Sequence, residues 1–545
     1  MKRFLPLTLY TALALAVMLP LYAPGYLFLL DMVMAPQIDL AHWREGGALS
    51  PQLPLAALLK LMSFALPTDL IQKLLLTAAL IIPGLAMERL ARRYLSHPWT
   101  LVSGIFYMLN PWVYERFLAG HWLVLIGYGI FPLSLALLIR VLEAPSWKHS
   151  LAFAALCALY PLLNIHWAYI AYGFSALLAA AWYFFHASFS SITIKKLFLG
   201  GIASFLLIFA VNAFWFKGFF APHATFPAIA SEDLAAFATR PDPVWGVWIN
   251  ALSLYGFWND EYLLPKDTLA LWPLITFAVL ALSLLGGLRL MRKKDPLGIA
   301  LAITLIPVIA FGVGYGDTLT RPFAEMLTSL IPGLKGLRET AKALGVLAAF
   351  YALCAPVGLH YLIKICVPRV GVHSRPLALG LPALLCAILL INVHSMFWGF
   401  SGQLTPSSYP ASWERVNEML IRSPDVRTAL FLPWHGYLAF PFTRGHRISN
   451  PAIRFFATPT IAAETVDNAY LFARDTQKPW DQTLFRLVQG ISTLEDEQDM
   501  LRAHEVTHVI IAEAYGRDRY APTESSPLLT PVLIEHDIAL YRIAY

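Results

Sequence analysis

Apolar runs as long as a membrane is thick recur through residues 1–400, and they constrain the fold of this chain more than any other feature. A spanning helix needs about 20 mostly apolar residues. Of the 545 residues, 58% are hydrophobic and 14% are charged, whereas about 25% are charged in typical soluble domains. We therefore predict a polytopic α-helical membrane protein with eleven spans, near residues 5–24, 69–89, 98–112, 121–142, 149–164, 166–186, 196–216, 268–290, 296–315, 342–364 and 377–399.

Lysine and arginine collect on one side of these spans. The clusters at 89–93, 289–294 and 364–375 all lie in one set of alternating loops. Short loops rich in these residues mark the cytoplasmic side of a membrane, so we predict a cytoplasmic N-terminus. The net charge of +6 does not indicate a nucleic-acid partner, because the cations are divided among loops between apolar runs. The other loops are long, aromatic and poor in lysine, and should face outside: 25–68, 113–120, 217–267 and 316–341.

The chain changes character after residue 400, where the apolar runs become short and alternate with polar residues. We predict that residues 1–400 form the transmembrane module and that residues 401–545 form an α/β domain on the outer face. The length of this second segment allows an independent core. Its expected helices are 412–422, 483–490 and 494–503, and its expected strands are 428–434, 507–513 and 538–544.

The common catalytic signatures do not occur in the sequence. It contains no glycine-rich phosphate loop, no HExxH motif and no GxSxG-type nucleophile elbow. The four cysteines have no metal-ligand spacing and should be buried small hydrophobes. They are Cys157, Cys354, Cys366 and Cys386. Any chemistry must therefore come from polar residues at the outer ends of the spans.

Two carboxylates follow the first span. Asp31 comes directly after Leu29 and Leu30, and Asp39 lies eight residues further on. A carboxylate held at the outer surface could act as a general base that deprotonates an acceptor hydroxyl. The simpler interpretations are an interfacial end-cap for Asp31 and a solvated residue for Asp39, in a short amphipathic helix with the sequence QIDLAHWRE. The following segment, 53–67, fits an interfacial helix at least as well as a span.

Two further stretches place charges beside aromatic residues on the outer face. In NPWVYERFLAGHW, residues 110–122, the polar side chains of Glu115, Arg116 and His121 could shape a sugar-binding pocket, although an interfacial aromatic belt also explains the pattern. His166 lies at a span junction, where a structural histidine is at least as plausible as a ligand.

The second stretch is PGLKGLRETAKALG, residues 332–345. On a helix, Arg338 and Lys342 are four residues apart and share a face, so they could hold a lipid phosphate. They could also pair simply with Glu339 and solvent.

This architecture resembles the GT-C superfamily of polytopic glycosyltransferases. The segments LLDMVMAPQ, NPWVYERFLAGHW, SEDLAAFAT, LYGFW, GLRETAK and RISNPAIRFFATP are similar to segments of bacterial and archaeal membrane proteins in the arabinofuranosyltransferase-like and YfhO-like branches. The resemblance implies that a first-loop carboxylate is the base or helps to hold a metal. That role falls on Asp31, with Asp39 as the rival. Because Asp31 has no adjacent acidic partner, a requirement for Mg²⁺ or Mn²⁺ stays open. The resemblance also implies that 401–545 binds acceptor or glycan.

The leading hypothesis is a cell-envelope glycosyltransferase that moves a sugar from a polyprenyl-phosphate donor to a glycan, lipid or protein acceptor outside the cell membrane. Asp31 would activate the acceptor, and Arg338 and Lys342 would hold the departing phosphate. A transporter or lipid flippase that uses the same charges is the first alternative. A non-catalytic assembly protein whose outer domain recruits a partner is the second.

Overall fold

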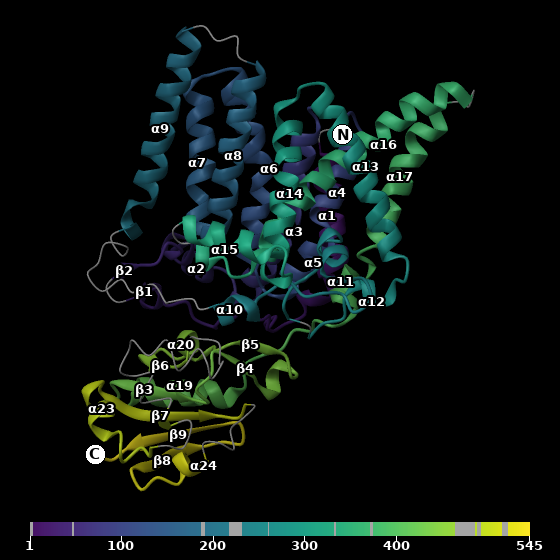
Figure 1. Cartoon of the computed structure of the whole chain (residues 1–545). Helices are drawn as coiled ribbons and strands as arrows, with labels where there is room; N and C mark the ends of the chain where they lie inside the picture. Colours follow the sequence, from purple (N-terminus) through teal and green to yellow (C-terminus); the bar gives the residue numbers. More distant parts are fainter. Residues whose placement is uncertain are drawn as a thin grey trace.

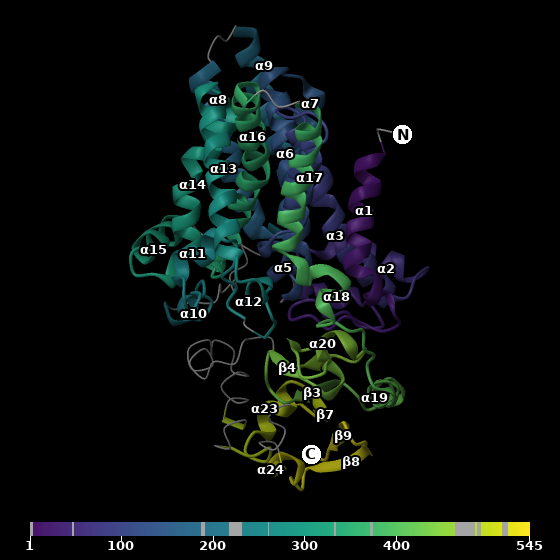
Figure 2. The ribbon, with the colours of Figure 1, turned by 90° about the vertical axis from the view of Figure 1, so that its right-hand side faces the viewer.

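A computed structural model describes residues 4–45, 48–186, 191–216, 231–259, 261–331, 334–370, 374–463, 486–487, 492–514 and 521–545. It consists of a bundle of long helices with a smaller sheet domain at one end (Figure 1). The N-terminus lies at the opposite end of the bundle from the sheet domain (Figure 1). A view turned by 90° shows the same two-part arrangement (Figure 2).

Each predicted span corresponds to a helix of the bundle. Within the described residues, eight helices are long and apolar enough to cross a membrane, or nine if a bent pair counts as one span. The predicted count of eleven also includes α4 and α7, which have only 10 and 17 residues. The protein is therefore a multi-pass membrane protein. The bundle helices are α1 Leu5–Met18, α3 Thr68–Ala91, α4 Trp99–Met108, α6 Trp122–Glu143, α7 Trp147–Leu163, α8 Ile165–His186, α9 Ser191–Phe216, α13 Trp272–Arg292, α14 Pro296–Val313, α16 Leu344–Val370 and α17 Ser374–Ile391.

Small residues let two of the long helices approach closely. A side chain at Gly286 of α13 would collide with the carbonyl oxygen of Cys354 in α16, and one at Gly358 of α16 would collide with that of Leu282 in α13. Close backbone approach at small residues is a common way to pack helices in membranes. This crossing fixes the position of α16, which directly follows the segment that contains Arg338, Glu339 and Lys342.

Short helices gather at the end of the bundle that faces the sheet domain (Figure 1). The helix α2 has 11 residues and is too short to cross a bilayer, as expected for an interfacial segment. The stretch QIDLAHWRE contains only the 3₁₀ turn Leu40–Trp43, followed by strand β1, so the predicted amphipathic helix there is wrong. The short elements are α2 Leu53–Ser63, α5 Pro111–Leu118, α10 Ser231–Ala236, α11 Gly246–Leu252, α12 Pro265–Thr268, α15 Arg321–Leu330, η6 Thr340–Ala343, β1 Arg44–Glu45 and β2 Ala48–Leu49.

The C-terminal domain is built on a mixed five-stranded sheet with the order β6-β3-β7-β9-β8. Strand β3 is parallel to β6 and β7, whereas β9 runs antiparallel to β7 and β8. A separate two-stranded ribbon joins β4 to β5. The elements are α18 Phe397–Ser401, α19 Ala411–Arg422, β3 Thr428–Leu432, β4 Tyr437–Ala439, β5 Arg447–Ser449, α20 Ala452–Phe455, β6 Thr460–Ile461, α23 Gln498–Ala503, β7 Val506–Ala512, α24 Ala521–Glu524, β8 Leu529–Ile534 and β9 Ile538–Ile543.

Alternate residues of the central strand enter two different cores. Phe431 of β3 packs with Trp413 of α19 on one face of the sheet. Leu430 of the same strand packs in the other core with Leu501 of α23. Side chains of a strand alternate between faces, so a strand that is buried on both faces has a continuous apolar sequence. This explains the apolar run from which a strand was predicted at residues 428–434.

The sequence predicted three strands of this domain, and it did not predict β4, β5, β6 or β8. The predicted helix at 412–422 and the predicted strands at 507–513 and 538–544 are confirmed as α19, β7 and β9. The helix expected at 494–503 begins only at Gln498. The helix expected at 483–490 lies mostly outside the described residues.

The loop that follows α1 is held between the bundle and the sheet domain. Leu29 and Met32 pack in the core of the bundle, whereas Phe28 and Val33 pack in a core of the sheet domain. The loop is therefore sandwiched, and this explains why Asp31 has apolar neighbours on both sides in the sequence.

Candidate functional site

A short helix places two charged residues at the mouth of the bundle. Asn110 caps the N-terminus of α5, its side chain accepting a hydrogen bond from the backbone N–H of Val113 at 3.2 Å. Pro111 occupies the first turn, where its missing N–H costs nothing. The helix ends at Leu118, and His121 follows one turn later, close to Arg116.

Gly120 closes the gap between this turn and the first loop. Its φ is +70°, and a Cβ there would lie 2.5 Å from the backbone nitrogen of Met32. Glycine adopts positive φ without steric cost, so it allows the two segments to touch. The neighbouring carbonyl of Ala119 accepts a hydrogen bond from the backbone N–H of Asp31 at 3.0 Å. The motif AGH thus positions the loop that carries Asp31.

Both oxygens of the Asp31 carboxylate accept hydrogen bonds. His121 Nε2 lies 2.8 Å from Oδ2, and the hydroxyl of Tyr437 donates to Oδ1 at 2.6 Å. The side chain of Asp31 keeps 33% of its surface exposed. Each carboxylate oxygen can accept a second hydrogen bond, so Asp31 can also receive the proton of a third group.

The contact with Asp31 fixes one proton of His121. An ionised carboxylate can only accept hydrogen bonds, so His121 Nε2, 2.8 Å from Asp31 Oδ2, carries the proton of that bond. On the other side of the ring, Arg116 Nη1 lies 3.5 Å from Nδ1. His121 therefore acts as a donor to the carboxylate.

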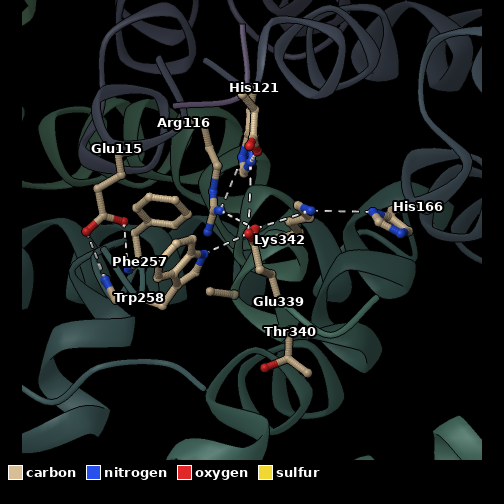
Figure 3. A network of polar contacts seen from close by, with 12 residues as sticks. Glu115, Arg116, His121, His166, Phe257, Trp258, Glu339, Thr340 and Lys342 are labelled. Carbon is tan, nitrogen blue, oxygen red and sulfur yellow. Dashed lines mark hydrogen bonds and ion pairs between the residues drawn. The ribbon is translucent and has the colours of Figure 1, made fainter. Parts of the chain in front are cut away.

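Glu339 is the hub of a buried charge network (Figure 3). Its Oε2 accepts from Arg116 Nη1 at 2.8 Å and pairs with Lys342 Nζ at 3.2 Å. Its Oε1 accepts from the indole N–H of Trp258 at 2.8 Å and lies 3.9 Å from His121 Nε2. Three separate segments of the chain therefore meet at one carboxylate.

The neighbours of Glu339 outweigh the effect of burial on its pKa. Burial alone would raise the pKa of this carboxyl, but Lys342, His121 and Arg116 together hold it well below its usual range. Arg116 is fully buried and stacks on the ring of Phe257, 4.7 Å from the ring centre. Glu339 is thus a fixed negative charge that neutralises part of a cationic cluster.

Arg338 and Lys342 do not share a helical face, so this part of the prediction is wrong. Glu339 between them has φ −82° and ψ 81°, and the 3₁₀ turn begins only at Thr340. Lys342 turns toward Glu339 and lies 3.5 Å from His166 Nδ1 (Figure 3).

Arg338 points elsewhere, with its guanidinium 4.2 Å from the ring centre of Phe237. Among the described residues it takes part in no recorded ion pair or hydrogen bond, and it is only partly buried. Arg338 therefore stands apart from the network of Lys342, and its contact with a phosphate stays a prediction.

Glu115 faces away from this cluster. Its two oxygens accept hydrogen bonds from the backbone N–H groups of Gly256 and Phe257 at 3.1 and 3.2 Å. Burial raises the pKa of Glu115 to about 7, against the opposing effects of Arg116 and the two N–H groups. Glu115 thus anchors the loop of Phe257 beneath Arg116.

Glu115 should make the folded protein less stable as the pH rises from about 4.5 to about 7. Its folded pKa lies above its ordinary value of 4.5, so the folded state binds more protons in this window and unfolding becomes easier as they leave. The shift corresponds to a loss on the order of 3 kcal/mol, complete above pH 7. Melting temperatures in detergent at pH 5 and pH 8 should therefore differ less in Glu115→Gln than in the wild type. An equal difference in both proteins would contradict the assignment.

A cavity of about 400 Å³ opens beside Asp31. Its walls come from the first loop, α2, the start of α6 and the sheet domain. They include Asp39, Trp43, Trp122 and Arg454. Asp39 is exposed on this wall, so the cavity contains both predicted carboxylates. The side chain of Trp43 lies 5.9 Å from the Arg454 guanidinium, measured to the ring centre.

The carboxylates of the cavity do not build a cation site with their described neighbours. Both oxygens of Asp31 already accept hydrogen bonds. Among the residues that the structure describes, no three His, Cys, Asp or Glu side chains come close enough to hold a metal ion. The described residues therefore form no three-ligand metal site around Asp31.

Three residues of the network were not predicted as site residues. Glu339 was recognised only as a partner for nearby cations, although its position between Arg338 and Lys342 is a usable signal. Trp258 lies in the segment LYGFW, which carried the family resemblance but no role. Tyr437 gave no sequence signal, because only the docking of the sheet domain brings it to Asp31.

Comparisons with known proteins identify the fold. No family model and no curated protein matches the chain. The arabinofuranosyltransferase AftD from Mycobacteria superposes on 100% of this chain with a TM-score of 0.66 at 14% identity. A mutant form of the same enzyme gives a TM-score of 0.65 at 13% identity and also covers 100% of this chain, with 42% of its own chain matched. ArnT from Cupriavidus metallidurans gives a TM-score of 0.49 at 11% identity, covering 98% of this chain and 97% of its own.

The chain spans only 40% of the length of the AftD chain that it matches. The likeness therefore applies to the fold, and it confirms the predicted GT-C-like architecture with a helical membrane bundle and a C-terminal sheet domain.

Proposed function

We propose that this protein is a membrane glycosyltransferase that moves a sugar from a polyprenyl-phosphate donor to a glycan, lipid or protein acceptor outside the cytoplasm. The observation that carries the proposal is the position of Asp31. A carboxylate fixed by two donors lies beside a cavity of about 400 Å³, next to a buried cationic network. The shared fold with an arabinofuranosyltransferase supports the same class of reaction.

In the proposed reaction, Asp31 is the general base. The acceptor hydroxyl enters the cavity, and the carboxylate takes its proton as the oxygen attacks the anomeric carbon of the donor. The bond from that carbon to the phosphate oxygen breaks, and the polyprenyl phosphate leaves with the bonding electrons, so the anomeric configuration inverts. A positioned base contributes about 10²- to 10⁴-fold to a rate. Asp39, exposed on the cavity wall, is the rival base.

The leaving phosphate gains negative charge, and the cations near the site would stabilise it. Arg338 has a guanidinium available for a bidentate contact with phosphate oxygens. Lys342 and Arg116 act at longer range, because both are engaged by Glu339. In this proposal His121 orients Asp31, and His166 holds Lys342 in place. Glu115 holds the loop of Phe257, on whose ring the Arg116 guanidinium stacks.

We further propose that the sheet domain lies on the outer side of the membrane and that the N-terminus lies on the cytoplasmic side. The walls of the cavity include Arg454 of the sheet domain, which supports a part for residues 401–545 in binding the acceptor.

The test is turnover of a lipid-linked donor by the purified protein. A panel of synthetic polyprenyl-phosphate monosaccharides is incubated with protein in lipid nanodiscs, with a mixture of envelope glycans as acceptors. Mass spectrometry then measures the released polyprenyl phosphate. We expect release from at least one donor, dependent on acceptor. Vesicles that accumulate a donor without releasing polyprenyl phosphate would instead indicate a transporter.

A further inference from the structure

The sheet domain contributes a side chain to the centre of the site. Tyr437, the first residue of β4, donates its hydroxyl proton to Asp31 Oδ1 at 2.6 Å, across 406 positions of the sequence. Burial raises the pKa of Tyr437 far above its usual value, and the charge of Asp31 raises it further. The hydroxyl therefore stays protonated and remains a donor across the working pH range.

The sheet domain also forms hydrogen bonds with the backbone on both sides of Asp31. The backbone N–H of Ser449 donates to the carbonyl of Leu30 at 2.7 Å. Arg454 Nη1 donates to the carbonyl of Val33 at 3.2 Å. Together with the packing of Phe28 and Val33 in its core, the domain fixes where the loop runs, and Tyr437 fixes how the carboxylate of Asp31 points.

Among the described residues, the carboxylate of Asp31 would keep only His121 as a hydrogen-bond partner without this hydroxyl, and it could rotate. The groups that face Asp31 or line its cavity come from both parts of the molecule, and they are His121, Lys342, Asp39, Arg454 and Tyr437. Glu339 lies next to His121, and the charges of Glu339 and Arg338 act on Tyr437. A carboxylate that rotates away from the cavity is displaced from the acceptor hydroxyl, so proton transfer to it becomes slower.

We infer that Tyr437 is a positioning residue for the proposed base, so that the sheet domain is part of the active site and not only a module that binds acceptor. The inference rests on the proposed function for its kinetic consequence. Its structural content, the control of Asp31 by a residue of another domain, does not depend on the reaction.

The test compares Tyr437→Phe with Tyr409→Phe. Tyr409 also donates its hydroxyl from the sheet domain to the first loop, at 3.1 Å to the carbonyl of Met34, but it does not touch Asp31. Each variant loses one hydroxyl from the same interface. We expect at least a tenfold loss of kcat with little change in KM for Tyr437→Phe, and less than a twofold change for Tyr409→Phe.

A second readout needs no turnover. A water-soluble carbodiimide with glycinamide labels the protonated form of an accessible carboxyl, and peptide mass spectrometry follows the labelling of Asp31 against pH. A hydrogen bond donated to a carboxylate favours its charged form. In Tyr437→Phe, we therefore expect the midpoint of labelling and the acid limb of the pH–rate profile to move to higher pH by about half to one unit. In Tyr409→Phe neither should move.

The outcomes separate the two proposals. If no donor is turned over but the labelling midpoint shifts in Tyr437→Phe alone, the proposed reaction fails and the positioning role stands. If turnover is found but Tyr437→Phe matches Tyr409→Phe in both readouts, the hydroxyl only helps to dock the domain and the inference is overturned.

Discussion

Replacing Asp31 by asparagine should lower sugar transfer by about a thousandfold and leave the protein folded. Asparagine has the same shape, and its carbonyl oxygen can still accept the hydrogen bond from Tyr437, but it cannot take a proton from an acceptor hydroxyl. Because binding of the donor does not require the base, kcat should fall much more than KM rises. Release of polyprenyl phosphate by purified Asp31→Asn, measured against the wild type, checks this.

Asp39→Asn is the matched control. Asp39 lies on the wall of the same cavity but is exposed, so its loss should change the rate by only a few fold. Elution from a size-exclusion column and the melting temperature should match the wild type for both variants. A full loss in Asp39→Asn with an active Asp31→Asn would transfer the role of base to Asp39.

The membrane part of the fold could be predicted because each of its rules acts locally. Twenty apolar residues in a row are sufficient to indicate a helix such as α6, and the ends of α3 and α13 are visible as clusters of arginine. The strands β3 and β7 were visible for the same reason, since they are short apolar runs buried on both faces, whereas the edge strands β6 and β8 were missed. For α4, which has only 10 residues, the length of the apolar run does not decide whether the helix crosses the membrane.

The site was harder to predict because its geometry depends on contacts between distant segments. The sequence predicted which polar residues share one face of the membrane, and the structure does bring Asp31 and His121 together. It did not indicate that Glu339 would bind Arg116, which lies 223 positions away in the sequence. A helix was assumed to continue through Arg338, whereas the backbone becomes helical only at Thr340.

Glu339 should be the most important charged residue for stability. Glu339→Gln removes the counter-charge of Arg116, which is fully buried, and of Lys342, whose side chain is 10% exposed. Breaking a buried ion pair from one side costs about 3–5 kcal/mol, because the remaining charge has no partner. We expect this loss in the unfolding free energy, and a clear drop in the melting temperature in detergent.

Two comparisons test whether the orphaned charge causes that loss. Glu418→Gln breaks an exposed pair with Arg422, whose side chains are 59% and 79% exposed, and should cost less than about 1 kcal/mol. The double variant Glu339→Gln with Lys342→Met removes one orphaned cation together with its partner, so it should be more stable than Glu339→Gln alone. The double-mutant cycle then gives the coupling between the two residues directly. If Glu339→Gln is as mild as Glu418→Gln, the network does not stabilise the fold, and its charges must be held in place by the packing around them.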